Sequence, residues 1–425
     1  MSPSGHSGTT IGSHDLLRTI SLEQLQTHLA LIDGVPRVVV GGNVATPWLV
    51  VDAIDRSIEK YRLFMLNAQV GVPDRPGVVT ETCFVGPGMR HHSALSYIPS
   101  RLSLAPLLFQ RTLPPDVVVL HCAPPRDGLL SLGTEVNVLP AALEACRIRG
   151  GLVIAVINSR MPYTFGDSEI AVELIDLAVE IDLDLPAAHA SPVDDSSLVI
   201  AESIAAMIDD GATLQLGIGV VPDCTLQALA RQRRGLRVWT EMFSDGLLGL
   251  DEAHALDEEH PITASFCFGS RRLYDWVDGN PRIHMLRTEK TNSPALIAAN
   301  RAMTSVNAAL EVDLFGQANA SRINARIHSG YGGQTDFIVG ALHSPGGQAF
   351  IALRSWHPRA DVSAVVPLLD EPVTSFQQTA VVTEQGVARL WGYDEKTQAR
   401  HLIEHAAHPR VRAELWEEAQ NLGLT

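Results

Sequence analysis

The sequence predicts an α/β protein with two similar domains, each built on a mostly parallel sheet. A chain of 425 residues, 46% hydrophobic and 19% charged, is too long for a single hydrophobic core. Short β-branched segments alternate with amphipathic helical segments, the order that produces parallel sheets covered by helices. Each half also begins with the same succession of strand, glycine-containing loop, proline and helix, at residues 37–54 and 212–232. This repetition favours two similar domains over one large sheet.

The N-terminal half contains three strand-like segments and two helical ones. Pro47 precedes the first helical segment, a position that suits proline. In the second, apolar residues recur at helical spacing from Leu139 to Cys146. The predicted strands are residues 37–40, 116–121 and 151–157, and the predicted helices are residues 48–54 and 137–149.

Residues 183–197 contain two prolines and a cluster of Ala, Ser and Asp, a composition typical of an interdomain linker. We therefore expect a flexible N-terminal tail at residues 1–15 and an N-terminal domain at residues 16–190. The C-terminal domain would then occupy residues 191–425 and carry the candidate catalytic residue.

The C-terminal half begins with a predicted helix at residues 197–210, which Gly211 ends as a C-terminal cap. An apolar strand-like segment then leads into Gly217. The other predicted strands are residues 236–238, 337–339, 348–353 and 362–368, and the other predicted helices are residues 223–232, 271–277 and 395–424.

The charge and the cysteine pattern exclude several classes of protein. A net charge of −16 argues against a surface for nucleic acid or anionic membranes, although it is compatible with a local basic pocket for a phosphorylated ligand. No apolar run is long enough to span a membrane, and the first 14 residues lack the apolar core of a signal peptide. Five scattered cysteines indicate reduced thiols and a cytoplasmic protein. His91 and His92 have no third ligand at metal spacing, so we expect no metal site.

The octapeptide at residues 239–246 contains the candidate catalytic residue, Glu241. It follows a strand-like run and closes with Ser244, Asp245 and Gly246, a turn signal. Glu241 is therefore expected where a strand ends, the position at which α/β sheets present their chemistry. A carboxylate there can act as a nucleophile that forms a covalent intermediate. The alternative is a structural glutamate at a strand end, either solvated or paired with a base.

Two glycine loops are candidates for ligand binding. Gly217-Ile218-Gly219 follows a strand and precedes a helix, where backbone N–H groups can approach an anion or a developing oxyanion. A tight turn could require the same glycines for steric reasons. The loop at residues 329–337, with glycines at 330, 332 and 333, could pack closely on an extended ligand or merely connect two elements.

Other polar segments are assigned supporting roles. Asn307 and Asp313 lie among apolar residues, where amides and carboxylates usually satisfy backbone groups. The segment at residues 158–168, which includes Met161 and Tyr163, is interpreted as an active-site loop from the other domain. Pro222 occupies the third glycine position of the dinucleotide-binding fingerprint, and the chain has no G-x-S-x-G elbow and no P-loop. A nicotinamide enzyme, a serine hydrolase and a kinase therefore lack support.

Taken together, these stretches resemble the acetyl-CoA hydrolase/transferase family from about residue 85 onward. The resemblance rests on several motifs that occur in the family's order and at its spacing, so it is specific. The matching segments are residues 161–168, 216–223, 240–246, 312–317, 332–337 and 381–388.

The resemblance implies two CoA-transferase-type (NagB-like) α/β domains and a γ-glutamyl-CoA thioester on Glu241. Coenzyme A would be a substrate and part of this covalent intermediate, with no permanently bound cofactor and no metal. The residues implied to bind CoA or the oxyanion are Gly217, Ile218, Gly219, Val220 and Val221, together with Gly332, Gly333 and Gln334 for CoA. The residues expected to support the site or line the substrate pocket are Trp239, Asn307, Asp313, Met161 and Tyr163.

Three departures from the family pattern concern the substrate. Trp239 stands where the family usually has histidine, Tyr163 stands where it often has arginine, and residues 287–294 differ from the usual Asn-Asp-Pro form. We expect a CoA-transferase that acts on a short acyl-CoA and a carboxylic acid, as a homodimer or a larger homo-oligomer. The alternatives are an acyl-CoA hydrolase that uses the same glutamate and a non-catalytic CoA-binding paralogue. Retention of Glu241 argues against the paralogue.

Overall fold

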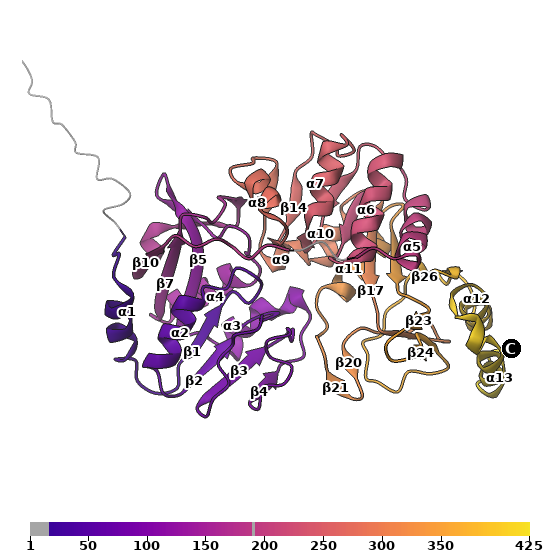
Figure 1. The fold of residues 1–425 in the computed structure, drawn as a ribbon, viewed down its shortest axis with the longest axis horizontal. Helices are drawn as coiled ribbons and strands as arrows, with labels where there is room; N and C mark the ends of the chain where they lie inside the picture. Colours follow the sequence, from indigo (N-terminus) through magenta and orange to yellow (C-terminus); the bar gives the residue numbers. More distant parts are fainter. Residues whose placement is uncertain (1–16, 189–191) are drawn as a thin grey trace, which may run out of the picture.

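The computed structural model describes residues 17–188 and 192–425, which form two large α/β units side by side along the long axis of the molecule (Figure 1). The expected flexible tail at residues 1–15 lies outside the described residues, as does the expected domain boundary at residues 190 and 191. Among the described residues, no helix is long and apolar enough to cross a membrane.

The first unit is built on a nine-stranded sheet with the order β10-β7-β5-β1-β2-β3-β4, in which all neighbours are parallel. Two short strands, β6 (Leu129–Ser131) and β9 (Glu169–Ala171), extend it from β5 in antiparallel fashion. The strands of the main order are β1 (Arg37–Val40), β2 (Tyr61–Phe64), β3 (Val78–Thr82), β4 (Leu95–Tyr97), β5 (Val117–Arg126), β7 (Leu152–Asn158) and β10 (Leu177–Ile181).

The second unit is built on another nine-stranded sheet, with the order β27-β26-β22-β17-β11-β12-β14-β16-β8. Only the β26–β27 pair of this sheet is antiparallel. Its strands are β8 (Phe165–Gly166), β11 (Thr213–Leu216), β12 (Arg237–Trp239), β14 (Ile262–Ala264), β16 (Ile283–Met285), β17 (Met303–Ala308), β22 (Gln348–Ala352), β26 (Ala380–Thr383) and β27 (Gly386–Arg389).

The two sheets have the same connectivity. In the first sheet, β1 is central: β2, β3 and β4 lie in that order on one side of it, and β5, β7 and β10 lie in that order on the other side. In the second sheet, β11 is central: β12, β14 and β16 lie in that order on one side of it, and β17, β22 and β26 lie in that order on the other side. The prediction of two similar α/β domains with mostly parallel sheets is thus confirmed. Strand β8 belongs to the segment at residues 158–168, so that segment reaches across and pairs with β16 of the second sheet.

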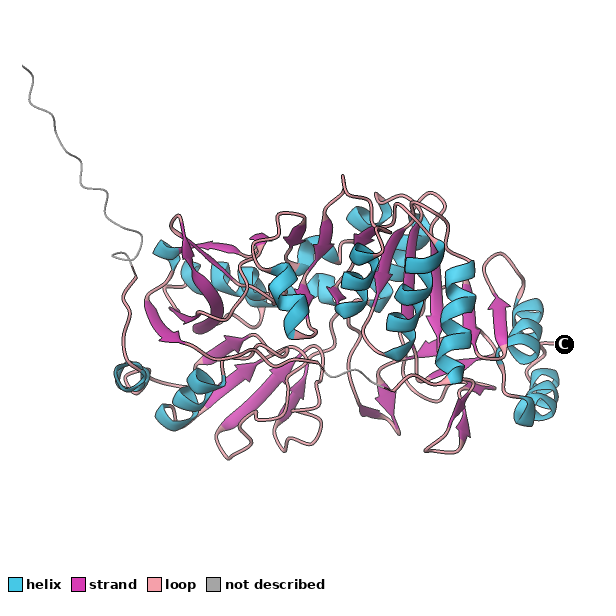
Figure 2. Ribbon diagram, turned by 45° about the horizontal axis from the view of Figure 1, so that its top comes forward, coloured by secondary structure: helices cyan, strands magenta, loops and turns pink. Residues whose placement is uncertain are grey.

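Helices cover both faces of each sheet, because alternate strand residues point to opposite sides (Figure 2). In β1, Val38 and Val40 join the cluster under α1 and α2, whereas Val39 joins the one under α3 and α4. In β22, Phe350 joins the cluster with α5, α6 and α7, whereas Ile351 joins the one with α10 and α11. The helices are α1 (Leu22–Leu29), α2 (Trp48–Ser57), α3 (Ala105–Arg111), α4 (Leu139–Ile148), α5 (Asp195–Ala206), α6 (Val220–Gln232), α7 (Asp245–Glu252), α8 (Arg271–Val277), α9 (Thr288–Thr291), α10 (Pro294–Ala298), α11 (Gln334–His343), α12 (Glu395–His401) and α13 (Arg412–Asn421).

Three local predictions are wrong. Ser244 does not open a turn but precedes helix α7, as its N-cap residue. Residues 337–339, expected as a strand, lie in α11, whose apolar residues Phe337, Ile338 and Ala341 are buried against the sheet. A short apolar run is compatible with a strand or with a helix, and here the tertiary packing favours the helix. The helical stretch at residues 395–424 is split into α12 and α13 by a π-helical turn and a 3₁₀ turn.

Candidate active site

Glu241 lies two residues beyond the last residue of β12, at the carboxyl ends of the parallel strands of the second sheet. Its backbone carbonyl accepts hydrogen bonds from the N–H groups of Ser265 (2.9 Å) and Phe266 (3.2 Å), which follow the neighbouring strand β14. The preceding Thr240 is buried, and its hydroxyl donates to the carbonyls of Leu216 (3.3 Å) and Met242 (2.9 Å). The backbone that carries Glu241 is therefore fixed from both sides.

The Glu241 carboxylate accepts a hydrogen bond from a well-oriented amide. Asn292 Nδ2 donates to Glu241 Oε2 at 3.0 Å. The hydroxyl of Thr291 donates to the other end of the same amide, Asn292 Oδ1, at 2.9 Å, and this contact fixes its orientation. The indole N–H of Trp239 donates to the Thr291 carbonyl at 2.9 Å. Trp239 therefore supports the residues behind the carboxylate.

Three influences set the proton affinity of Glu241. Burial raises its pKa to about 7, the hydrogen bond from Asn292 opposes that rise, and repulsion from Asp336 adds to it. Burial raises the pKa of Asp336 to about 6, against the opposing effect of hydrogen bonds from Ser103. A carboxyl group with a pKa near neutrality, in a cavity, is a candidate for chemistry because its ionised form is poorly solvated.

The glycine loop before α11 packs directly on this carboxylate. A Cβ atom on Gly333 would lie 2.0 Å from Glu241 Oε2 and 2.2 Å from Asn292 Nδ2, so a larger residue would displace both groups. Gly332 has a φ of +56°, and a Cβ there would lie 3.1 Å from the Phe84 ring. Both glycines are thus required by close approach, and the loop is held tightly in place.

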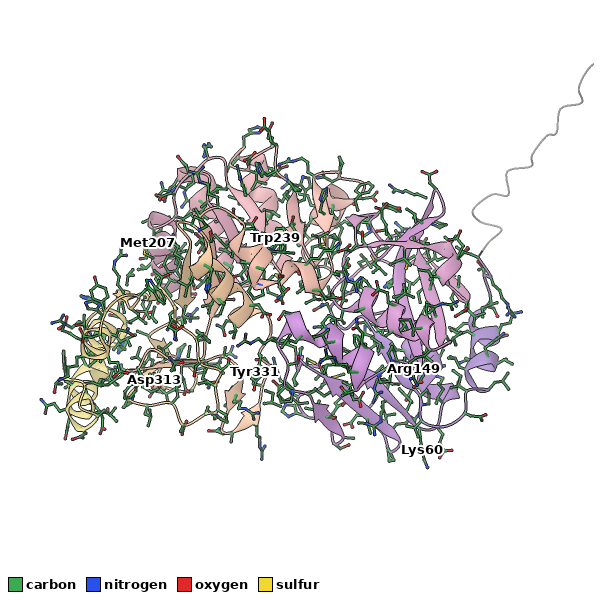
Figure 3. The ribbon with its side chains drawn as sticks, turned by 180° about the vertical axis from the view of Figure 1, so that it is seen from behind. Lys60, Arg149, Met207, Trp239, Asp313 and Tyr331 are labelled. Atoms are coloured by element: carbon green, nitrogen blue, oxygen red, sulfur yellow. The ribbon has the colours of Figure 1, made fainter. Side chains whose placement is uncertain are left out.

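The N-terminal unit holds the same loop from its other side. Phe84 and Gly330 form an antiparallel bridge, and the N–H of Val85 donates to the Ser329 carbonyl at 2.7 Å. The N–H of Leu102 donates to the Gly332 carbonyl at 3.0 Å. Tyr331, in the middle of this loop, lies at the junction of the two units (Figure 3). The site is therefore assembled from both units.

A cavity of about 220 Å³ opens in front of Glu241. Its walls are aromatic and aliphatic side chains, amide side chains and glycine backbone, and no Lys, Arg or His side chain lines it among the described residues. The lining residues are Phe84, Gln215, Leu216, Gly217, Glu241, Met242, Asn307, Ala308, Ala320, Ser329, Gly330, Tyr331, Gly332, Gly333, Gln334 and Phe337.

Six residues singled out from the sequence meet in this cavity: Gly217, Glu241, Asn307, Gly332, Gly333 and Gln334. Asn307 belongs to an amide network, because its Nδ2 donates to Ser305 Oγ (2.8 Å) and to Gln215 Oε1 (3.2 Å). The Ser305 hydroxyl also donates to Gln215 Oε1, at 2.7 Å. This network places carboxamide groups on the cavity wall.

The remaining candidates do not line the cavity. Ile218 and Gly219 line a separate groove, and Val220 and Val221 form the first turn of α6. Asp313 accepts hydrogen bonds from the N–H groups of Phe315, Gln317 and Leu369, which stabilise a turn.

Met161 and Tyr163 are buried in a small apolar cluster of the first unit. The Tyr163 hydroxyl donates to Glu169 at 3.1 Å, and the Arg126 guanidinium lies 4.3 Å from the Tyr163 ring centroid. Neither side chain lines the Glu241 cavity. The structure therefore places Met161 and Tyr163 away from this cavity, whereas Asp167 of the same segment pairs with Lys290 of the second unit at 2.7 Å.

The sequence reasoning missed Asn292, Asp336 and Phe84. Asn292 lies in the segment at residues 287–294, and its role depends on a contact 51 residues away in sequence. Asp336 lies within the segment at residues 332–337 that matches the family. Its two hydrogen bonds from Ser103, at 3.1 and 2.8 Å, come from the other half of the chain. No local signal predicts such long-range contacts.

The paired sheets of identical connectivity, with a half-buried carboxylate at their junction, define a CoA-transferase-type α/β protein. The crystal structure of 4-hydroxybutyrate CoA-transferase from Porphyromonas gingivalis superposes with a TM-score of 0.80 and 31% identity, covering 95% of this chain and 98% of that one. The C-terminal domain model of the acetyl-CoA hydrolase/transferase family matches residues 269–419.

Relatives extend the match over most of the chain. The 4-hydroxybutyrate coenzyme A transferase of Clostridium kluyveri is 38% identical over 334 residues, 76% of each chain. The succinyl-CoA:acetate/propanoyl-CoA:succinate CoA transferase of Fasciola hepatica is 33% identical over 413 residues, 90% of this chain and 84% of the relative. The chain belongs to the acetyl-CoA hydrolase/transferase family and is an enzyme of that family.

Proposed function

We propose that this protein is a CoA-transferase that moves CoA from a short acyl-CoA to a carboxylic acid through a γ-glutamyl-CoA thioester on Glu241. The observation that carries the proposal is the state of the Glu241 carboxylate. It faces a cavity, has a pKa raised to about 7, and accepts a hydrogen bond from Asn292 beside Gly333, whose Cβ position it overlaps.

The proposed reaction begins with attack of a Glu241 carboxylate oxygen on the acyl carbonyl carbon. The C–S bond breaks, which leaves an acyl-glutamyl anhydride and CoA thiolate. The thiolate then attacks the γ-carbonyl of the anhydride, so the glutamyl thioester forms and the acyl group leaves as a carboxylate. A second carboxylate runs the same steps in reverse. Each step exchanges one anion for another, so no proton, metal or redox partner is needed.

The surroundings of Glu241 suit both directions of this reaction. Burial keeps the carboxylate poorly solvated and therefore more nucleophilic, while the Asn292 amide retains enough of the ionised form at neutral pH. The same amide is positioned to hydrogen-bond the γ-carbonyl of the thioester. Gly217 lines the cavity with nothing within 4 Å of its Cβ position, which leaves room for the acyl or pantetheine group.

The covalent intermediate provides the test. Incubation with acyl-CoA alone should add the mass of CoA, less water, to the peptide that contains Glu241. Glu241→Ala should abolish both the adduct and turnover, whereas Glu404→Ala, at a distant surface carboxylate, should change neither. Absence of the adduct across a panel of acyl-CoAs, or full activity of Glu241→Ala, would refute the proposal.

The alternative reaction is hydrolysis, in which water intercepts the glutamyl thioester. The family includes both activities by its own description, so the same adduct is expected for either. The two are separated by the fate of the adduct. Rapid release of free CoA from the adduct without an added carboxylic acid would identify a hydrolase. An adduct that is stable until a carboxylic acid is added, and is then converted to a new acyl-CoA, would identify a transferase. Either outcome excludes a non-catalytic paralogue.

A further inference from the structure

Asn292, the amide that donates to Glu241, stands at the end of a helix that is too short to be stable alone. Helix α9 comprises only Thr288–Thr291, and isolated helices of this length do not persist in water. Asn292 follows as its C-cap residue and is fully buried. The position of the amide must therefore be set by contacts between α9 and the rest of the molecule.

Backbone contacts hold α9 at both of its ends, at the junction of the two units (Figure 1). The first unit packs its 3₁₀ turn at Leu102–Leu104 against the helix. The N–H of Thr288 donates to the carbonyl of Asn137, also in the first unit, at 3.0 Å. At the other end, the Thr291 carbonyl accepts the indole N–H of Trp239. These contacts keep the helix in place whatever side chain precedes it.

Arg287, the residue before α9, adds a side-chain contact to the first unit. Its guanidinium donates to both oxygens of Glu144 in α4, from Nη1 at 2.6 Å and from Nη2 at 2.9 Å. The same Nη2 donates to Glu289 of α9 at 2.7 Å. Only 18% of the Arg287 side chain is exposed. One planar group therefore ties the start of α9 to a helix of the other unit, a geometry that lysine cannot reproduce.

Asp167 reinforces this contact from the segment that carries β8. Its carboxylate accepts the backbone N–H of Arg287 at 3.1 Å and the ammonium group of Lys290 at 2.7 Å. Its own N–H donates to the Met285 carbonyl at 2.9 Å, which anchors it to the second sheet. Two cations thus meet three carboxylates around α9. We refer to this group as the α9 clamp: Arg287, Lys290, Glu144, Asp167 and Glu289.

The α9 clamp lies outside the Glu241 cavity, because none of its five side chains lines that cavity. The influences that set the pKa of Glu241 are burial, the hydrogen bond from Asn292 and the charge of Asp336, in that order. The route from Arg287 to the carboxylate therefore runs through the position of Asn292.

Resting on the proposed function, we propose that Arg287 is a positioning residue, which holds α9 against Glu144 of the first unit so that Asn292 stays bonded to Glu241. Loss of the guanidinium leaves α9 in place through its backbone contacts but lets the amide shift. A shift of about 1 Å in a group that contacts the reacting atoms is costly to the rate. An ion pair on α4 of the first unit thereby influences the reactivity of a carboxylate on the second sheet.

Arg287→Met tests this role, because methionine keeps much of the side-chain length and removes the charge. kcat/KM at pH 6 should fall roughly fivefold, less than in Asn292→Ala, and the acid limb should move to higher pH. Arg287→Lys keeps the charge without the bidentate contact, so its profile should lie between those of Arg287→Met and the wild type. The matched control is Arg147→Met, which breaks another ion pair of α4, with Asp176, and should leave the pH profile unchanged.

Two further variants separate positioning from a direct effect of charge. Glu144→Gln removes a negative charge, which by direct action would move the acid limb to lower pH, whereas loosening of Asn292 moves it to higher pH, the result expected here. In the Asn292→Ala background, Arg287→Met should change neither kcat/KM nor the limb. The role of Arg287 would be overturned by a shift to lower pH in Glu144→Gln, by additive losses in the double variant, or by a lower melting temperature of Arg287→Met with an unchanged limb. Failure of the proposed function differs from these outcomes, because the Glu241 adduct would then be missing from the wild type itself.

Discussion

The chemistry of Glu241 depends on residues that are remote from it in sequence. Asn292 supplies a hydrogen bond that stabilises the ionised carboxylate, and Asp336 supplies a charge that destabilises it. Burial acts in the same direction as Asp336 and is the largest of the three influences. In the proposed mechanism Glu241 must be ionised to attack, so the acid limb of kcat/KM should lie near pH 7 in the free enzyme.

Two substitutions should move this acid limb in opposite directions. Asn292→Ala removes the hydrogen bond that lowers the pKa of Glu241, so the pKa rises further and activity at pH 6 falls more than activity at pH 8.5. Asp336→Asn removes the repulsion that raises the pKa, so the limb moves to lower pH. We expect an overall loss of roughly tenfold for Asn292→Ala from the missing hydrogen bond. The pH profile of kcat/KM measures both effects, and shifts in the same direction would contradict this account.

Glu241 could be proposed as the catalytic residue from the sequence because a strand end, a turn-like motif and two glycine loops occur in order along the chain. Asn292 and Phe84 could not, because their roles arise from contacts between segments that are far apart in sequence. Trp239 shows the same limit: its position two residues before Glu241 suggested the substrate pocket, yet its indole binds the backbone that carries Asn292.

At the level of elements, the sequence predicted the positions of strands and helices better than the structure of short apolar runs. Strand β1 and helix α8 have the predicted bounds, because an uninterrupted β-branched run and a periodic apolar pattern are unambiguous. Residues 337–339 were expected as a strand but lie in α11. Their side chains suit either structure, and in the folded protein Phe337 and Ile338 are buried on the inner face of this helix, whose N-cap residue is Gly333.

The loop before α11 gives a sharp prediction. Gly333→Ala should reduce activity roughly a hundredfold, because its methyl group would displace the carboxylate and amide that it overlaps. Gly333 has a φ of −97°, which alanine adopts readily, so the fold should be retained. Turnover and the melting temperature are measured together.

The matched control for this substitution is Gly249→Ala. Gly249 lies in α7 with nothing within 4 Å of its Cβ position, so alanine should stabilise the helix by about 0.5–1 kcal/mol and leave turnover unchanged. Equal activity of Gly333→Ala and Gly249→Ala would show that the loop does not touch the reacting carboxylate.

At the scale of the whole molecule, the two units form the site together although most of its residues belong to the second. The first unit holds the 329–333 loop through backbone hydrogen bonds and places Phe84 on the cavity wall. Ser103 anchors Asp336 through both its N–H and its hydroxyl. We therefore expect the first unit to exclude water from the proposed thioester. The extent of this exclusion would determine how much of the thioester is transferred to an acid and how much is hydrolysed.

Phe84→Ala tests this role of the first unit. Removal of the ring opens the cavity beside Gly332 and admits water, so a larger share of the glutamyl thioester should be hydrolysed rather than passed to an acid. Phe84→Leu keeps most of the apolar volume and should partition the thioester almost as the wild type does. The ratio of free CoA to new acyl-CoA, measured at a fixed acid concentration, reports the partition independently of the overall rate. A constant ratio in all three proteins would mean that water exclusion depends on the second unit alone.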